Sequence, residues 1–173
     1  AAIWPTTISA AVVNGVKGRQ AAAADLFRQA FNRTIDPSGR TYWSNKLVTI
    51  TRPEMLSRLT GSSEFYRRAG GTTPQFVDAV YQSVLGRAAD PSGRSYWINR
   101  LNHGRSVEGV ARSLVASSEY RRTQVRITFD RVLDRAPTVP ERDSWTAQIA
   151  TTRIENLIAT LAASAEFYDV TIS

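Results

Sequence analysis

Two tyrosines and two arginines that recur at a fixed spacing are the residues of this sequence best suited to bind a ligand. Arg40 and Tyr42 reappear as Arg94 and Tyr96, in each case 54 positions further along the chain. A tyrosine ring can stack on a sugar, and a guanidinium group binds carboxylates and phosphates through paired hydrogen bonds. We therefore predict that these four residues bind a cell-surface glycan or another anionic ligand.

Residues that could perform catalysis are not grouped in the sequence. His103 is the single histidine and stands beside a glycine, the chain has no cysteine, and the acidic residues are spread singly. Nucleophilic and general acid–base chemistry both need two or more such groups together. A glycine-rich phosphate loop is also missing. We predict a non-enzymatic protein without a cofactor.

An Asp-Pro-Ser-Gly stretch occurs twice and must orient the recurring aromatic residues. Residues 36–43 and 90–97 are identical at seven of eight positions, which indicates a duplicated unit. The proline moves the preceding aspartate out of the helical conformation, and this aspartate can then cap the next helix. A calcium loop is the alternative, but it needs about six oxygen ligands and each stretch offers one carboxylate. We predict a structural corner and no metal site.

A tryptophan follows each Asp-Pro-Ser-Gly corner, at positions 43 and 97. Trp145 lies 48 positions after Trp97, in a repeat that lacks the corner. A large aromatic residue at the same place in each repeat usually fills the core. We predict that the tryptophans are central core residues. The adjacent Tyr42 and Tyr96 are better candidates to face a ligand, because neighbouring helix positions point about 100° apart.

The duplicated stretch organises the chain into three tandem helical repeats behind an extended arm. We place the arm at residues 1–20, repeat one at 21–72, repeat two at 73–124 and a degenerate repeat three at 125–173. Apolar residues recur with the 3.6-residue period of helices that pack on a core. The predicted fold is all-α, with short helices forming a compact body. No glycine or proline lies between Arg122 and Arg135, so we expect one helix to continue across the last boundary.

An arginine and a glutamate recur at opposite ends of every repeat, including the third, which lacks the Asp-Pro-Ser-Gly stretch. Each arginine closes the first helix of its repeat, where the helix dipole favours a cation. We predict one ion pair in each repeat: Arg33 with Glu64, Arg87 with Glu119 and Arg135 with Glu166.

The N-terminal segment, residues 1–15, is apolar and uncharged, so it needs a surface that covers it. Its proline and β-branched residues favour an extended conformation. It could pack on its own domain, but we predict that it docks on a neighbouring copy and gives a homo-oligomer or polymer. The predicted contact residues are Ile3, Trp4, Ile8, Val12 and Val13.

The net charge of +7 and the isoelectric point of about 10.4 favour anionic partners, although an arginine-rich genome would give the same composition. Nucleic acid is the weaker candidate, because basic charge alone is not specific. No apolar run approaches the roughly 20 residues of a membrane span. The sequence starts without methionine, as a processed exported protein would, so we expect an extracellular or cell-surface location.

Repeat two resembles the DUF4214 family through residues 76–97, FVDAVYQSVLGRAADPSGRSYW, and residues 117–120, SSEY. The resemblance extends over repeat one from residue 27 and partly over repeat three. This family is similar to the repeated unit of phycobilisome linker domains. The resemblance implies a helical module of secreted and cell-surface bacterial proteins without an assigned activity, and the likeness to linkers implies protein–protein assembly.

The leading functional prediction is a non-catalytic, exported structural or adhesion protein whose copies are linked through the N-terminal arm, as in filaments or surface layers. The alternative is an extracellular module that binds carbohydrate or a polyanion through Arg40, Tyr42, Arg94 and Tyr96. Open-ended assembly in solution would favour the first prediction, and a monomer would favour the second.

Overall fold

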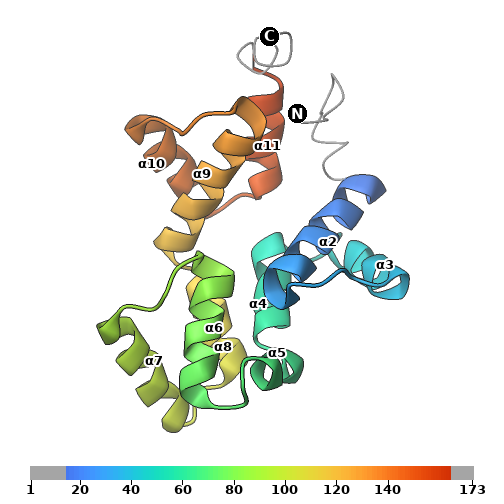
Figure 1. The fold of residues 1–173 in the computed structure, drawn as a ribbon. Helices are drawn as coiled ribbons and strands as arrows, with labels where there is room; N and C mark the ends of the chain where they lie inside the picture. Colours follow the sequence, from blue (N-terminus) through green and yellow to red (C-terminus); the bar gives the residue numbers. More distant parts are fainter. Residues whose placement is uncertain (1–14, 165–173) are drawn as a thin grey trace. The chain divides into compact units, whose positions relative to one another are not determined.

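The computed structural model describes residues 15–164, and every regular element within them is a helix (Figure 1). The prediction of an all-α fold is confirmed. The helices of this part of the chain are α2 (Val16–Phe31), α3 (Pro37–Lys46), α4 (Arg52–Thr60), α5 (Ser63–Arg68), α6 (Thr73–Leu85), α7 (Pro91–Asn102), α8 (Val107–Val115), α9 (Ser118–Leu133), α10 (Val139–Gln148) and α11 (Ile154–Ala162).

Contacts between residues divide the chain into two units. The larger unit, residues 20–120, contains repeat one and repeat two up to Tyr120. Of the described residues, 15–19 and 121–164 make up the other unit, which contains repeat three. One continuous hydrophobic cluster extends through repeats one and two, so these two repeats share a core.

The two repeat boundaries differ in the way their helices are joined. Gly70 and Gly71 separate α5 from α6 with φ angles of 117° and 74°, a conformation that residues with a side chain rarely adopt. At the next boundary α9 runs unbroken from Ser118 to Leu133, as the sequence predicted. The last helix of repeat two and the first helix of repeat three are therefore one element.

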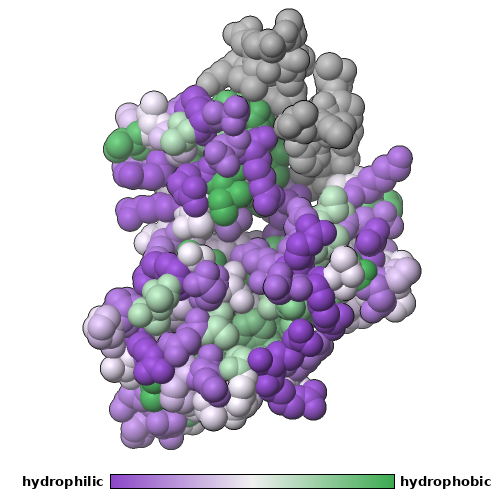
Figure 2. All heavy atoms as spheres, in the orientation of Figure 1, coloured by the Kyte–Doolittle hydropathy of each residue, from purple (hydrophilic) through white to green (hydrophobic). Residues whose placement is uncertain are grey.

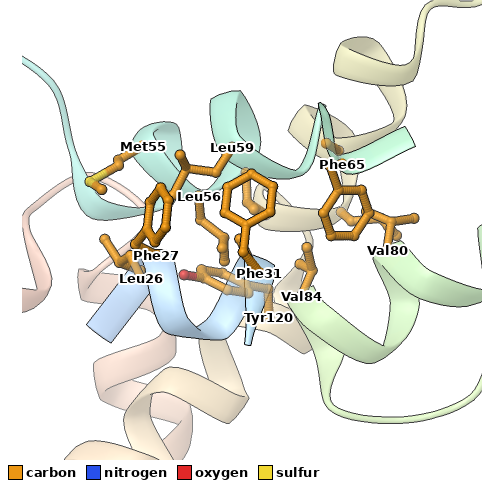
Figure 3. Packing of buried hydrophobic residues seen from close by; sticks show 14 of the residues in the cluster. Leu26, Phe27, Phe31, Met55, Leu56, Leu59, Phe65, Val80, Val84 and Tyr120 are labelled. Atoms are coloured by element: carbon orange, nitrogen blue, oxygen red, sulfur yellow. The ribbon is translucent and has the colours of Figure 1, made fainter. Parts of the chain in front are cut away.

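The core of the larger unit contains a chain of aromatic rings that passes from α2 through α5 to α6. Figure 3 labels Phe27, Phe31 and Phe65 of this chain. The ring centroids of Phe27 and Phe31 are 4.8 Å apart, those of Phe31 and Phe65 are 6.2 Å apart, and those of Phe65 and Phe76 are 6.1 Å apart. Burial of each such ring contributes about 2–3 kcal/mol. Apolar residues of α4, α6 and α8 and the ring of Tyr120 belong to the same cluster.

The core of the other unit is smaller. It is made by α9 and α11, with half-buried residues of α10 packed against it. Its buried members are Val125, Phe129, Leu133, Leu157, Leu161 and Ala162.

The first helix of each repeat ends at a residue in the left-handed conformation. Asn32, Gly86 and Asp134 occupy this position, with φ angles of 51°, 71° and 51°. Asparagine and aspartate tolerate this conformation better than other residues with a side chain, and glycine adopts it without strain. The chain therefore turns in the same way three times, just before the recurring arginine.

The equivalent helices α4 and α8 pack against each other in opposite directions. Gly61, which follows α4, lies so close to Glu108 that a Cβ added to the glycine would be 2.5 Å from the Cα of Glu108. At the opposite end of the pair, Pro53 and Ala116 line an open groove. The missing side chain of Gly61 thus permits a close approach at one end of the pair.

The recurring arginines of repeats one and two connect the two ends of their repeats, as predicted. Arg33 donates to Glu64 at 2.8 Å, and Arg87 donates to both carboxylate oxygens of Glu119 at 2.5 and 2.9 Å. Arg135 donates to both oxygens of Glu141 at 3.0 and 2.8 Å, while its predicted partner Glu166 lies outside the described residues.

Each of these arginines also lies over an aromatic ring of the preceding helix. The Cζ atoms of Arg33, Arg87 and Arg135 are 4.7, 5.3 and 5.1 Å from the ring centroids of Phe27, Tyr81 and Phe129. A cation over a ring face is stabilising. The ring contact recurs in all three repeats, and in each repeat the arginine also pairs with a glutamate, so these interactions belong to the scaffold.

Replacing Glu119 by glutamine should lower the free energy of unfolding by up to about 1 kcal/mol, because paired hydrogen bonds to Arg87 become weaker. Both side chains are close to half exposed, which limits the effect. Urea denaturation of the variant measures it. Glu108→Gln, which alters a more exposed pair within α8, is the control and should change stability less. An unchanged denaturation midpoint for Glu119→Gln would argue against the role of this pair.

Candidate functional site

The Asp-Pro-Ser-Gly stretches start α3 and α7 in the same way. Asp36 accepts hydrogen bonds from the Gly39 N–H at 2.8 Å and the Ser38 hydroxyl at 2.6 Å. In repeat two the corresponding distances to the aspartate are 2.9 Å from the glycine and 2.6 Å from the serine. The proline is in the first turn of each helix. The predicted structural corner is confirmed.

These hydrogen bonds favour the charged form of both aspartates. The Ser92 hydroxyl and the Gly93 N–H lower the pKa of Asp90 to about 2, and the Gly39 N–H and Ser38 lower the pKa of Asp36. Arg135 and Thr138 lower the pKa of Glu141 to about 2. The fold therefore favours the ionised form of these carboxyl groups.

The folded protein should lose stability as the pH falls from about 4 toward 2. Carboxyl groups with a pKa below that of the unfolded chain stabilise the fold above pH 4, and this contribution disappears once they are protonated. Thermal denaturation followed by circular dichroism between pH 7 and pH 2 tests this. Asp90→Asn should make the decline less steep. A melting temperature that stays constant through this range would contradict the expectation.

Helices α3 and α7 are surface helices. Only Ser44 of α3 is buried, and no residue of α7 is buried. Each is held through a half-buried tryptophan that packs against the core cluster, together with a few aliphatic residues. Most of the surface of these two helices is exposed, so most of their side chains face solvent. The aspartate cap fixes the start of each helix.

The tryptophans lie at the edge of the core, and the prediction that they fill its centre was wrong. Trp43 and Trp97 are half-buried and pack against the larger core, and Trp145 does so in the other unit. The central positions are taken by phenylalanine and aliphatic residues of α2, α4 and α6. A residue can recur in every repeat because it attaches a surface helix.

The two predicted tyrosines are exposed and lie in equivalent surroundings. Tyr42 and Tyr96 are each 54% exposed. Tyr42 lies edge-to-face against Trp43 at 5.2 Å and 83°, and Tyr96 lies against Trp97 at 4.9 Å and 76°. The tryptophan thus supports the tyrosine ring while leaving much of its surface open to a ligand.

The structure does not place the predicted arginines beside these tyrosines. Arg94 donates to both oxygens of Asp78 on α6, at 2.7 and 2.9 Å. In repeat one the position of Asp78 is occupied by Ala24, and Arg40 has no side-chain bond within residues 15–164. Positions two apart on a helix point about 200° apart, so the arginine and tyrosine of each repeat do not share a face.

A different cation accompanies each tyrosine. Lys46 and Arg100 follow Tyr42 and Tyr96 by four positions, a spacing that places both side chains on one helix face. The Lys46 Nζ is 5.6 Å from the centroid of the Tyr42 ring. The sequence prediction missed these two cations, although their four-residue spacing from a ligand-facing tyrosine could have revealed them.

Repeat three lacks this tyrosine–cation face. The positions of Tyr96 and Arg100 are occupied by Ser144 and Gln148, and the Gln148 amide donates to the Ser144 hydroxyl at 3.1 Å. The Asp-Pro-Ser-Gly corner is missing from the same repeat, whereas its tryptophan and its arginine ion pair are present. The corner, the exposed tyrosine and the cation therefore occur together in two repeats and are absent together from the third.

Two open grooves lie in the larger unit. One, of about 430 Å³, runs between the start of α4 and the end of α8. The other, of about 310 Å³, has Phe31, Phe65 and Ala79 among its lining residues and Arg68 beside them. An apolar patch is visible near the centre of Figure 2, surrounded by hydrophilic residues. Neither groove includes the tyrosine–cation faces.

No group of three or more histidine, cysteine or acidic side chains that could hold a metal ion occurs within residues 15–164. The Nδ1 of His103 lies 2.8 Å from the carbonyl oxygen of Asn99. In the same part of the chain no helix has the length and apolarity to cross a membrane. The predicted arm contacts at Ile3, Trp4, Ile8, Val12 and Val13 lie outside the described residues.

The repeated helices and their shared core define an all-α repeat protein. Within it, residues 56–124 match the family model described as "Domain of unknown function (DUF4214)". The match begins inside α4, ends inside α9 and includes all of repeat two, so the predicted resemblance is confirmed for this stretch. No curated protein and no solved structure matches the chain. The likeness to phycobilisome linkers stays a prediction.

Proposed function

We propose that this chain is a non-catalytic, exported adhesion protein that binds carbohydrate through the outer faces of α3 and α7. The observation that carries the proposal is the joint occurrence of three features in repeats one and two. The capped corner, the exposed tyrosine and the cation four positions later are present in both, while repeat three keeps only the scaffold. Features that are gained or lost together, independently of the scaffold, are expected of one binding surface.

The chemistry of these faces supports binding over catalysis. Tyr42 and Tyr96 offer ring faces on which the C–H groups of a sugar can stack. The exported location is an expectation from the sequence and from the family resemblance, and it belongs to the same proposal.

Replacing both tyrosines by alanine should reduce carbohydrate binding by at least tenfold, because each substitution removes a stacking ring and a loss of about 1.4 kcal/mol already corresponds to tenfold in affinity. The measurement is retention on an array of immobilised bacterial polysaccharides, followed by calorimetry with the best ligand. Val139→Ala, which removes an exposed apolar side chain from α10, is the matched control. Retention of the double variant equal to that of the wild type would refute the proposal.

Self-assembly through the N-terminal arm is the second candidate function. It is favoured by the apolar and uncharged composition of residues 1–15. Deletion of these residues should convert an oligomer or polymer into a monomer, as measured by light scattering across a range of concentrations. A full-length chain that is monomeric at every concentration would eliminate this candidate and would leave the carbohydrate proposal intact.

A further inference from the structure

The charges on α3 and α7 all have the same sign. The ionisable residues other than tyrosine are Arg40 and Lys46 in α3, and Arg94 and Arg100 in α7. The nearest acidic residues in sequence are the capping aspartates, whose carboxylates are held by serine and glycine at the start of each helix. The outer faces of these helices are therefore positively charged.

Within residues 15–164, Lys46 and Arg100 have no acidic partner, and each follows an exposed tyrosine by about one helical turn. Neither Lys46 nor Arg100 forms an ion pair with an acidic residue within residues 15–164, whereas Arg58 and Arg112 are paired along their helices with Glu54 and Glu108. A cation that is not neutralised can bind an external anion without first giving up an internal partner.

We propose that Lys46 and Arg100 bind the carboxylates of an acidic polysaccharide whose sugar rings stack on Tyr42 and Tyr96. This inference rests on the proposed carbohydrate function and specifies its ligand class. A uronic acid carries its carboxylate at the edge of the ring, so a sugar lying on the tyrosine places that group toward a cation one helical turn away. The guanidinium of Arg100 can bind it with two hydrogen bonds, and the ammonium of Lys46 binds it as a point charge.

The proposal gives Arg94 a different role. Its guanidinium is occupied by both oxygens of Asp78, and this pair attaches α7 to α6. Arg94 is thus a structural residue, and the ligand-binding cation of repeat two is the arginine six positions later. Of the residues predicted from the sequence, the tyrosines stay in the site.

The experiment compares polygalacturonate with the same polymer after methyl esterification, which removes the negative charge and keeps the sugar chain. The full-length protein should bind the acidic polymer at least tenfold more tightly, because charge-assisted hydrogen bonds are about twice as strong as neutral ones. This preference should decrease as salt is raised from 50 to 500 mM, since exposed charges are screened. Equal affinity for both polymers would overturn the inference and leave the carbohydrate function standing. Binding to neither polymer, nor to any other polysaccharide, would overturn both.

Charge substitutions distinguish binding at a defined site from non-specific attraction of the acidic polymer to a basic protein. Lys46→Gln with Arg100→Gln should reduce binding of polygalacturonate about tenfold or more and leave the melting temperature unchanged. Arg126→Gln with Arg122→Gln removes the same charge from an exposed part of α9 and should have little effect. An equal loss in both double variants would mean that only the net charge matters, and would overturn the inference.

Repeat three allows a gain-of-function test. Ser144→Tyr with Gln148→Arg places a tyrosine and a cation on α10 at the positions used in α7. The variant should bind polygalacturonate with higher apparent affinity, because a third face adds to the valency for a long chain. Unchanged binding by a variant that retains the wild-type melting temperature would contradict a site that consists of the tyrosine and the cation.

Discussion

Replacing Gly61 by alanine should lower the free energy of unfolding by about 3 kcal/mol, the upper part of the range for overpacked positions. The added Cβ would lie 2.5 Å from the Cα of Glu108 and 2.8 Å from the carbonyl oxygen of Ser57. Both obstacles are backbone atoms, so a change of side-chain rotamer cannot relieve the clash. The end of α4 and the start of α8 must move apart, which disturbs the core shared by repeats one and two.

Ala116 provides the control for this prediction. It occupies the position of Gly61 in repeat two, where α8 ends, and it is exposed. Ala116→Gly should change the free energy of unfolding by less than about 1 kcal/mol, as expected at the end of a helix. Guanidinium denaturation of both variants makes the comparison. A loss below about 1 kcal/mol for Gly61→Ala would contradict the close approach of α4 and α8.

Replacing Gly93 by alanine should destabilise the fold by about 2 kcal/mol, because the new methyl group would meet the Tyr81 hydroxyl. The added Cβ would be 2.6 Å from that oxygen and 3.1 Å from Oδ2 of Asp90. Tyr81 is only 5% exposed, so its ring has little room to move. The glycine of the corner in repeat two is therefore required by packing as well as by the turn.

The corner of repeat one should tolerate the same substitution better. The residue equivalent to Tyr81 there is Phe27, which has no hydroxyl group. The closest atom to a Cβ at Gly39 is Cγ1 of Ile35, at 3.2 Å. Gly39→Ala should therefore cost less than about 1 kcal/mol.

A double-mutant cycle isolates the contact between Gly93 and Tyr81. Tyr81→Phe removes the hydroxyl that obstructs the new methyl group, so Gly93→Ala should cost at least about 1 kcal/mol less in this background than in the wild type. Urea denaturation of the four proteins gives the coupling energy. Additive effects of the two substitutions would mean that another contact makes Gly93→Ala unfavourable.

The features that the sequence predicted correctly depend on local chemistry or on comparison between repeats. The aspartate caps of α3 and α7 involve residues three positions apart, so the stretch itself contains all their partners. The pairs Arg33–Glu64 and Arg87–Glu119 join distant residues, yet the presence of both members in each repeat marked them as partners. The internal duplication thus allowed contacts between residues far apart in the sequence to be predicted from one chain.

The features that were missed depend on the direction in which each helix faces its neighbours. Arg94 and Tyr96 belong to the same repeated stretch, but only packing on α6 directs Arg94 to Asp78 and leaves Tyr96 exposed. The edge position of the tryptophans likewise follows from α3 and α7 lying outside the core. Lys46 and Arg100 became candidates once the exposed helix face was known.

Repeat three shows most clearly which features belong to the scaffold and which belong to the proposed binding face. Its arginine lies over Phe129 and pairs with Glu141 from the first turn of α10. Thr138 caps the helix in place of the aspartate, with Glu141 completing a capping box. A surface helix can thus follow the first helix of a repeat without the Asp-Pro-Ser-Gly corner. Because the scaffold does not require the corner, its occurrence together with the tyrosine and the cation in the other two repeats supports a role in binding.

The most direct test of this account is a titration of isotope-labelled full-length protein with oligogalacturonate, followed by amide chemical shifts in two-dimensional NMR. We predict shifts at residues 40–48 and 94–102, and none in α10, whose Ser144 and Gln148 provide an internal control. The shifts should disappear in the Tyr42→Ala and Tyr96→Ala double variant. Shifts of equal size in α10, or a complete absence of shifts with every polysaccharide tried, would contradict the assignment of α3 and α7 as binding surfaces.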